Sequence, residues 1–365
     1  MLGNEASFAP AKGPILVALS GGVDSAVAAW QLREAGFEVA AAYIRTWMNE
    51  DELGECPAEE DIRDGEAVAR YLGIDFEVIN LVGAYRERVV SYLVEGYRRG
   101  LTPNPDVMCN REMKFGVFLD RAREMGFESV ATGHHCRKVL EAGSFQLMEG
   151  ADPEKDQSYF LSMITGEQLA GARFPIGHLE KKEVRRIAAA AGLPNAEKKD
   201  SQGICFLGKV NIQKFLADYI PEAPGEIVNE NGDLLGAHGG LHNFTIGQRK
   251  GIGIPSNTDH EFYVVVAKDY ATNRLVVEFD SNRESVLYTN EAFVSQISWL
   301  GEPPGAGRQL SGRVRYRDGR TPLHLAMEGE DRARVTFDVR QRGLASGQIL
   351  ALYEGMHLLG GATFA

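Results

Sequence analysis

The stretch "ILVALSGGVDSAVAAW", residues Ile15 to Trp30, decides the fold of this chain. It begins as a short apolar run typical of a buried strand, breaks at two glycines and an aspartate, and then turns apolar again with helical spacing. A buried strand followed at once by a helix is the repeating unit of parallel α/β sheets. The stretch therefore predicts the first strand and the first helix of such a sheet.

The same unit recurs over the next hundred residues. Strand patterns occupy "FEVAAAYI" (37–44), "IDFEVINL" (74–81) and "FESVATGHH" (127–135), and helix patterns occupy "EDIRDGEAVARYLG" (60–73) and "YRERVVSYLVEGYRRG" (85–100). Repeated strand–helix units joined by right-handed crossovers form a doubly wound parallel sheet. We therefore expect an α/β domain over residues 1–210.

The pattern changes near residue 211. Helices become scarce and alternating strand patterns follow, first in "FYVVVAKD" (262–269) and "RLVVEFD" (274–280), then in "SGRVRYR" (311–317), "ARVTFDV" (333–339) and "QILALYEG" (348–355). This predicts a small middle domain over 211–282 and a C-terminal β-barrel over 283–365. A chain of 365 residues is long enough for two or three cores.

Composition excludes several classes of protein. Hydrophobic residues at 44% and charged residues at 25% are ordinary for a globular chain, and no apolar run approaches the roughly 20 residues of a membrane helix. The N-terminus has no signal-peptide pattern, so a cytoplasmic location without membrane partners is expected. The chain has four cysteines, and no two of them form a CxxC pair, which argues against a disulfide scaffold or a zinc ribbon. They are Cys56, Cys109, Cys136 and Cys205.

The charge distribution bears on nucleic-acid binding. A formal net charge of −12 speaks against a sequence-blind nucleic-acid binder, because such proteins depend on a general excess of cations. It leaves room for a local basic surface. One candidate is "GRVRYRDGR" (312–320), in which four arginines lie around Tyr316, although such a cluster also suits a solvated strand face.

The glycine turn, Ser20–Ser25, has the chemistry of an anion site. Gly21 and Gly22 let the backbone approach a phosphate, and Ser20 and Ser25 add hydroxyl donors where a helix begins. A Walker P-loop would carry a lysine that this turn lacks. The alternative is a plain strand–turn–helix joint, and the ordered strand, serines, aspartate and helix favour phosphate binding.

The pattern SGGxDS resembles the signature of the PP-loop ATP pyrophosphatases. The resemblance implies an adenine nucleotide alpha hydrolase-like fold and cleavage of ATP to AMP and pyrophosphate, with adenylation of a carbonyl oxygen that a nucleophile then replaces. Ligases and tRNA thiolases share this signature, so the turn alone leaves the nucleophile open.

Two cysteines are candidates for that nucleophile. Cys109 lies in a proline-rich loop before the helix pattern 111–126, where a helix dipole would favour its thiolate. Cys205 lies between two glycines, shortly after Lys198 and Lys199. A single cysteine is more often a small buried hydrophobe, but two in polar, turn-rich segments of an ATP-using domain favour function.

Five further motifs make the resemblance specific: "NPDVMCNREMKF" (104–115), "KDQSYFL" (155–161), "DSQGICFLG" (200–208), "FTIGQRKGIGIP" (244–255) and "VRYR" (314–317). Together they resemble the tRNA-specific 2-thiouridylases, which place sulfur on the wobble uridine of certain tRNAs. The resemblance implies an ATP-dependent tRNA-uridine 2-sulfurtransferase with Mg²⁺ on the phosphates, acting on wobble-uridine tRNAs such as those for Glu, Gln and Lys.

The resemblance also implies roles for individual residues. Cys205 corresponds to a persulfide carrier, loaded by a sulfur-relay protein or a cysteine desulfurase, and Cys109 to the second catalytic cysteine, with which it would end as a disulfide. Asp106 is placed to act as acid or base. The implied ATP-binding residues are Ala18, Leu19, Ser20, Gly21, Gly22, Val23, Asp24, Ser25, Ile44 and Gly133.

The implied tRNA contacts fall in three places. Asn104, Pro105 and Asp106 would receive the flipped target base. Lys155, Asp156 and Gln157 would contact the tRNA, as would Arg315 and Tyr316. Arg249 and Lys250 form a weaker candidate, since a glycine-rich turn with two cations also suits a structural hairpin.

Three alternatives stay open at this point. One is a PP-loop ligase with an amine nucleophile, in which both cysteines would be dispensable. Another is a tRNA-binding or redox-sensing protein with a vestigial ATP site. In a third, Cys109, Cys205 and Asp106 ligate an iron–sulfur cluster.

Overall fold

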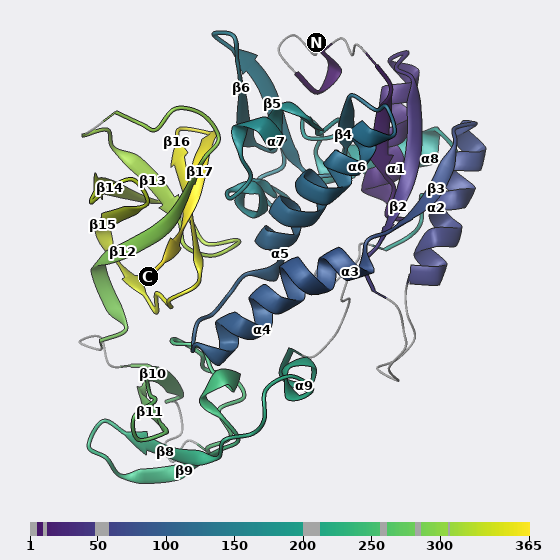
Figure 1. Ribbon diagram of the computed structural model, residues 1–365. Helices are drawn as coiled ribbons and strands as arrows, with labels where there is room; N and C mark the ends of the chain where they lie inside the picture. The colour runs from purple at the N-terminus through teal and green to yellow at the C-terminus, as the bar shows by residue number, and fades with distance from the viewer. Residues whose placement is uncertain are drawn as a thin grey trace.

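A computed structural model describes residues 6–9, 13–47, 58–199, 212–255, 261–281, 286–305 and 307–365. Three β assemblies account for most of the molecule (Figure 1). A parallel sheet flanked by helices comes first along the chain, a four-stranded sheet follows, and the C-terminal strands form a barrel. Cys56 and Cys205 lie outside the described residues.

The N-terminal sheet has the strand order β3-β2-β1-β4-β7, and all of its pairings are parallel. This confirms the predicted doubly wound sheet, because the chain runs outward from β1 to β3 and then returns to the other side of β1. The strands are β1 (Ile15–Ala18), β2 (Val39–Arg45), β3 (Phe76–Asn80), β4 (Ser129–Ala131) and β7 (Ala172–Arg173).

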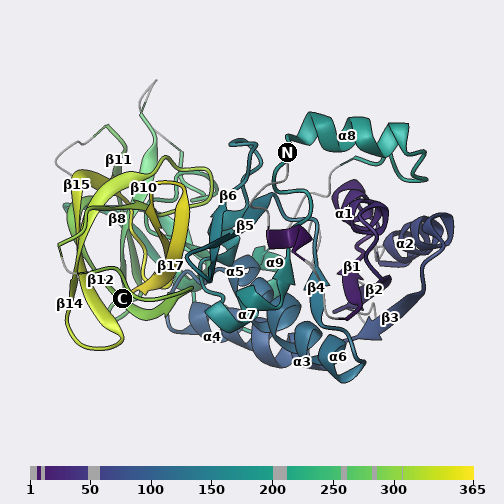
Figure 2. The same cartoon turned by 90° about the horizontal axis from the view of Figure 1, so that it is seen from above.

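Helices cover both faces of this sheet (Figure 2). Apolar side chains of α1 (Val23–Glu34), α2 (Ala58–Leu72) and α8 (Lys181–Ala190) pack with β1 on one face. On the other face α6 (Phe118–Glu124) and α7 (Gly166–Ala170) form a second core with the segment that precedes α6. Burial on both faces explains why the central strand β1 reads as a continuous apolar run rather than an alternating one.

Two long helical segments lie beside the sheet. The first runs through α3 (Val82–Tyr85), a π-helical stretch (Arg86–Val90) and α4 (Ser91–Arg98). The second, here called the cysteine helix, runs through α5 (Pro105–Met108) and a π-helical stretch (Cys109–Val117) into α6, with a kink at Gly116. Short 3₁₀ turns occur at Ala6–Phe8, Ser158–Leu161 and Leu241–Asn243.

The middle region begins with the short helix α9 (Ile212–Ala217) and forms a four-stranded sheet in the order β10-β11-β8-β9. Its strands are β8 (Gly225–Asn229), β9 (Leu234–His238), β10 (Tyr263–Asp269) and β11 (Arg274–Phe279). The structure confirms the strands predicted over 262–269 and 274–280.

Six C-terminal strands close into an antiparallel barrel, because β12 pairs with both β15 and β17. They are β12 (Tyr288–Trp299), β13 (Leu310–Arg313), β14 (Thr321–Met327), β15 (Arg332–Arg342), β16 (Ile349–Glu354) and β17 (His357–Phe364). The predicted barrel is therefore confirmed. Closure removes the unpaired edges that an open sheet of this kind would leave.

Two features depart from the sequence-based expectation. The strand predicted over 311–317 ends at Arg313, and the chain then turns, with Arg317 at a φ of 71°. A hairpin that the sequence analysis did not predict, β5 (Cys136–Glu141) and β6 (Ser144–Glu149), leaves the N-terminal domain and pairs with β17. Within the described ranges, no helix is both long and apolar enough to cross a bilayer.

Candidate active site

The glycine turn lies at the point where the winding of the parallel sheet reverses. It follows β1, which has β2 on one side and β4 on the other, and the chain connects β1 to β2 before it ever reaches β4. In open α/β sheets, ligands bind outside the carboxyl ends of the strands at such a switch point.

The conformation of the turn requires glycine at its centre. Gly21 has a φ of 75°, and a Cβ built on it would lie 2.5 Å from the Asp61 carbonyl oxygen, so only glycine fits there. Gly22 is the N-cap of α1, and no side chain in the described part of the chain caps this helix end. The Ser25 hydroxyl donates to the Gly22 carbonyl and accepts from the Ser20 backbone N–H. The uncapped helix N-terminus is suited to an anion.

The other predicted ATP residues lie around this turn at different depths. Ser20 is exposed, whereas the Leu19 and Val23 side chains are buried in the core. Gly133 follows β4 and lies so close to α1 that an added Cβ would be 2.6 Å from the Ser25 nitrogen. Ile44, at the end of β2, is buried.

Asp24, in the first turn of α1, faces the side chains of Lys181 and His135. Lys181 Nζ donates to both of its carboxylate oxygens, at 2.7 and 2.8 Å, and His135 Nε2 lies 3.5 Å from Oδ1. Burial alone would raise the pKa of Asp24. The facing His135 ring and the charge of Lys181 outweigh burial and hold that pKa below the ordinary value, so Asp24 is a carboxylate at neutral pH.

Three residues at this site were missed by the sequence analysis: Lys181, His135 and Asn195. Asn195 Nδ2 donates to the Gly21 carbonyl at 2.8 Å. Of the three, only His135 could have been placed at the site from the sequence, because "TGHH" directly follows the predicted strand that ends at the switch point. Lys181 and Asn195 are more than 150 residues from the glycine turn, and nothing local in the sequence links them to it.

The cysteine helix starts earlier than expected. The Asn104 side chain accepts hydrogen bonds from the Asp106 and Val107 N–H groups, and Pro105 occupies the first helical position. These two residues form a good helix start, so Cys109 lies one turn inside the helix rather than just before it. The expectation that Cys109 precedes the helix was wrong for this reason.

Cys109 is 1% exposed and belongs to a hydrophobic cluster that joins three helical segments. Its neighbours there include Val90, Leu93 and, from α9, Phe215 and Leu216. Helix α9 begins a few residues after Cys205 along the chain. The first described helix after Cys205 in the chain thus contributes side chains to the same hydrophobic cluster as Cys109.

The described chain that precedes Cys205 is fixed beside the glycine turn. Lys198 Nζ donates to Asp61 Oδ1 at 2.7 Å and to Asp64 Oδ2 at 2.5 Å, both on α2. Hydrogen bonding to the two carboxylates outweighs the effect of burial and raises the pKa of Lys198. The chain on either side of Cys205 is thus attached to the nucleotide side at Lys198 and to the Cys109 cluster at α9.

The predicted base-receiving residues and the predicted barrel contact lie close together. The Asn110 side chain donates to the Asp106 carbonyl and to the Phe160 carbonyl, at 3.1 and 3.2 Å. The Phe160 ring lies 4.4 Å, centroid to centroid, from the Tyr316 ring. Arg315 donates to the carbonyls of Arg342 and Gly343. The first turn of the cysteine helix therefore adjoins the barrel through Phe160.

The turn Lys155–Gln157 has an inward role in this structure. Asp156 is 3% exposed and accepts hydrogen bonds from the Gly150 and Ser158 backbone N–H groups. The Gln157 side chain accepts from the His135 N–H at 2.9 Å. The Asp156 and Gln157 side chains therefore form hydrogen bonds within the protein rather than project into solvent.

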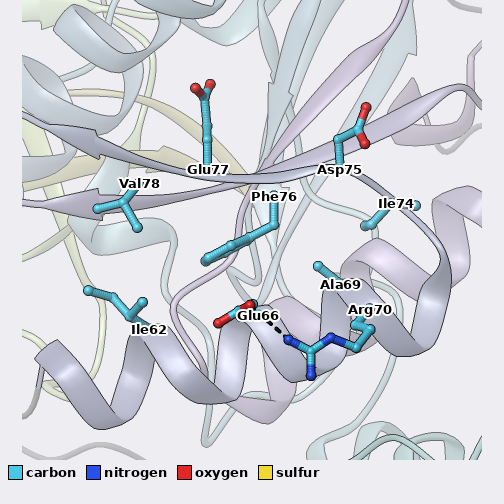
Figure 3. Close-up of a pocket in the computed structure, with 9 residues that line it drawn as sticks. All are labelled: Ile62, Glu66, Ala69, Arg70, Ile74, Asp75, Phe76, Glu77 and Val78. Atoms are coloured by element: carbon cyan, nitrogen blue, oxygen red, sulfur yellow. Dashed lines mark hydrogen bonds and ion pairs between the residues drawn. The ribbon is translucent and has the colours of Figure 1, made fainter.

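A separate hollow of about 430 Å³ opens between α2 and the edge strand β3 (Figure 3). Phe76 lies at its centre, and the Glu66–Arg70 ion pair crosses one side of it. None of the predicted site residues lines this hollow. Among the described residues, no group of three or more His, Cys, Asp or Glu side chains could hold a metal ion. The iron–sulfur alternative requires Cys205, which lies outside them.

The fold and the glycine turn define the class: a PP-loop nucleotide-binding protein with two appended β domains. Family models match in the same order, as a tRNA methyl transferase HUP domain over 13–209, a tRNA methyl transferase PRC-barrel domain over 213–278 and an aminomethyltransferase beta-barrel domain over 289–364. The chain belongs to the tRNA-specific 2-thiouridylase family.

The curated relatives span nearly the whole chain. The tRNA-specific 2-thiouridylase MnmA of Akkermansia muciniphila is 50% identical over 351 residues, covering 96% of this chain and 98% of its own. The protein of the same name from Exiguobacterium sibiricum is 43% identical, covering 99% and 96%. These full-length relatives carry the thiouridylase name, whereas the family-model descriptions mention methyl transfer.

Solved structures match more remotely. A 4-thiouridine synthetase–RNA complex with bound ATP is 19% identical with a TM-score of 0.36, covering 56% of this chain and 50% of that one. A similarity this low carries no argument here.

Proposed function

We propose that this chain is an ATP-dependent tRNA 2-thiouridylase. The observation that carries the proposal is the position of the described residues on either side of Cys205: Lys198 is bound to α2 at Asp61, which adjoins Gly21, and α9 belongs to the Cys109 cluster. A sulfur carrier between a nucleotide site and a second thiol is what adenylation followed by sulfur transfer requires. The amine-ligase and vestigial-site alternatives are not favoured, because neither needs this arrangement and the full-length relatives are named as thiouridylases.

ATP would occupy the glycine turn, with its phosphates on the backbone N–H groups of residues 20–25 and with Ile44 and Gly133 on the adenine side. The uridine C2 oxygen would attack the α-phosphorus, giving an O-adenylate and releasing pyrophosphate. Electrostatic stabilisation by the helix N-terminus suits the charge that develops on the phosphates.

Magnesium fits this site as a cation carried by the nucleotide. The Asp24 carboxylate is the acidic group nearest the turn, and both of its oxygens already accept hydrogen bonds from Lys181. Phosphate oxygens of ATP would therefore supply the ligands, and the ion would offset their negative charge.

Sulfur transfer would use the two cysteines in turn. A persulfide on Cys205, loaded by a sulfur-relay protein or a cysteine desulfurase, would bond through its terminal sulfur to C2 as AMP leaves. The Cys109 thiolate would then attack the Cys205 sulfur, which forms a disulfide and releases 2-thiouridine, and a cellular thiol would reduce the pair. Asp106 would serve as acid or base near Cys109. Because Cys109 is 1% exposed, its cluster must open before it reacts.

The tRNA would bind across the three domains, for which we propose the limits 1–210, 211–282 and 283–365. Asn104, Pro105 and Asp106 would receive the wobble uridine of tRNAs for Glu, Gln and Lys, with Tyr316 beyond Phe160 on the barrel side. Arg315 would act beside Tyr316. Of the turn 155–157, Lys155 would contact the RNA, while Asp156 and Gln157 shape the turn from inside. A tRNA substrate points to the cytoplasm as the working compartment.

The test is a nucleoside analysis by mass spectrometry. Unmodified tRNA is incubated with the purified protein, ATP, magnesium and a persulfide donor, and 2-thiouridine, AMP and pyrophosphate are quantified. We expect 2-thiouridine to appear only with ATP, in equal amount to AMP. If ATP is split but no thiolated nucleoside forms with any donor, the amine-ligase alternative replaces this proposal.

A further inference from the structure

His135 is buried beside the glycine turn, where its ring lies 3.5 Å from Asp24 without forming a hydrogen bond of normal geometry. It is 2% exposed, and neither ring nitrogen has a hydrogen-bond partner among the described residues. A buried polar group without a partner is costly, and such groups in native proteins often serve a ligand. The nearest acceptor is Asp24 Oδ1, 3.5 Å from Nε2, and both Asp24 oxygens already accept from Lys181.

The backbone that carries this ring is held from two sides. The His135 N–H donates to Gln157 Oε1 and its carbonyl accepts from the Gln157 N–H, both at 2.9 Å. Gly150 lies so close that an added Cβ would be 2.6 Å from the His135 carbonyl oxygen. A fixed backbone that presents an unpartnered ring is preorganised for binding, because little ordering entropy remains to be lost.

The position of the ring beside the start of α1 indicates the chemical class of ligand that it would contact. Nε2 faces Asp24 in the first turn of α1. The 132–135 segment lies close to the same turn, because a Cβ added to Gly133 would be 2.6 Å from the Ser25 nitrogen. The backbone N–H groups of the glycine turn lie at this same N-terminal end of α1. Asp24, which the ring faces, has a side chain that is 30% exposed, whereas the ring itself is buried. An anion at the turn would thus offer the ring the acceptor that it lacks.

We propose that His135 is an ATP-contacting residue whose ring donates a hydrogen bond to a phosphate oxygen of the nucleotide in the glycine turn. The inference rests on the proposed use of ATP and adds a side-chain donor to a site otherwise built from backbone N–H groups. Asp24 then acts as a positioning residue that holds the His135 ring and Lys181 on the same side of the phosphates.

The experiment measures binding of an ATP analogue with a methylene group between the α and β phosphorus atoms, by calorimetry with magnesium and the full-length protein. His135→Phe keeps a ring and removes both nitrogens, and His135→Gln restores one donor. We expect about 10-fold weaker binding for the Phe variant and partial recovery for the Gln variant, since a hydrogen bond to a charged group has that size. His238→Phe is the matched control, because His238 is also buried with an unpartnered Nδ1 among the described residues, on β9 of the middle sheet. Its affinity should equal that of the unaltered protein.

A second readout uses the unaltered protein and so does not depend on how the variants fold. With ¹⁵N-labelled histidine, the His135 ring signal should shift when the analogue is added. Equal affinities for the unaltered protein and His135→Phe, or an unmoved ring signal on binding, would overturn the inference while leaving the proposed function intact. Failure of the unaltered protein to bind the analogue would overturn both.

Discussion

The Arg313 guanidinium lies 2.9 Å from the buried Asp156 carboxylate and joins the C-terminal barrel to the turn beside the nucleotide site. A second guanidinium nitrogen donates to Glu149 at 3.0 Å, so one arginine serves two carboxylates. Asp156 in turn fixes the backbone next to Gln157, which holds His135. The barrel therefore contacts the N-terminal domain through an ion pair at the turn that also holds the His135 backbone.

Removing this arginine should be costly. Arg313→Met leaves the buried Asp156 carboxylate without its cation, while Glu149 keeps the ion pair with Arg320, and we expect the free energy of unfolding to fall by about 3 kcal/mol. Urea denaturation followed by circular dichroism measures it. Arg332→Met, at an exposed position on β15 of the same barrel, is the control and should change stability by no more than about 0.5 kcal/mol. Equal effects of both changes would contradict the role given to Arg313.

Gly21→Ala should abolish activity through geometry alone. The new Cβ would meet the Asp61 carbonyl, so the turn must shift, and displacement of phosphate donors by about 1 Å typically costs 100-fold in rate. Gly36→Ala is matched, since Gly36 has a φ of 84° but nothing within 4 Å of an added Cβ. Both variants carry the backbone penalty of about 1 kcal/mol. In the thiolation assay only Gly21→Ala should lose activity, and loss in both would point to instability instead.

The two described cysteines are both buried and should respond differently to replacement by serine. Cys109→Ser should give no 2-thiouridine above background, because the thiolate that releases the product is gone. Cys136→Ser, at the start of β5, should keep most of the activity although it also places a hydroxyl in the core. Nucleoside mass spectrometry of both variants decides this. Retained activity in Cys109→Ser would remove Cys109 from the mechanism.

Lys138 should make stability depend on pH. Its Nζ donates to the Ala170 and Ala172 carbonyls, and burial together with the charge of Arg173 lowers the pKa of Lys138 to about 7. Between pH 7 and the unfolded pKa near 10.4, the unfolded chain binds the extra proton, so stability rises with pH in that window. Below pH 7 both states are protonated and the cost of burying the charge is greatest.

Lys138→Met should remove this dependence. Relative to the variant, the unaltered protein should gain about 2 kcal/mol in the free energy of unfolding from pH 6.5 to pH 8.5. Urea denaturation at the two pH values measures the difference. Parallel pH profiles for the two proteins would show that Lys138 keeps its ordinary pKa in the fold.

The features that could be predicted from the sequence are those determined by residues close together in the chain. The strand at Ile15 and the helix after Gly22 were predictable, because apolar periodicity and the conformational freedom of glycine act over a few neighbouring residues. The resemblance to the thiouridylases likewise rested on short contiguous motifs. The early start of the cysteine helix is also a local matter, since Asn104 caps it and Pro105 occupies its first position.

By itself, then, the sequence determined the doubly wound sheet, the barrel, the glycine turn and the pair of candidate cysteines. Only the tertiary structure decided that Lys181 and His135 face Asp24, that Asp156 turns inward to Arg313, and that Cys109 is buried in one cluster with side chains of α9. These contacts join residues far apart in the chain, 157 positions in the case of Lys181 and Asp24. Such pairs leave no periodic pattern, because their geometry exists only once the sheet, the helices and the barrel have packed together.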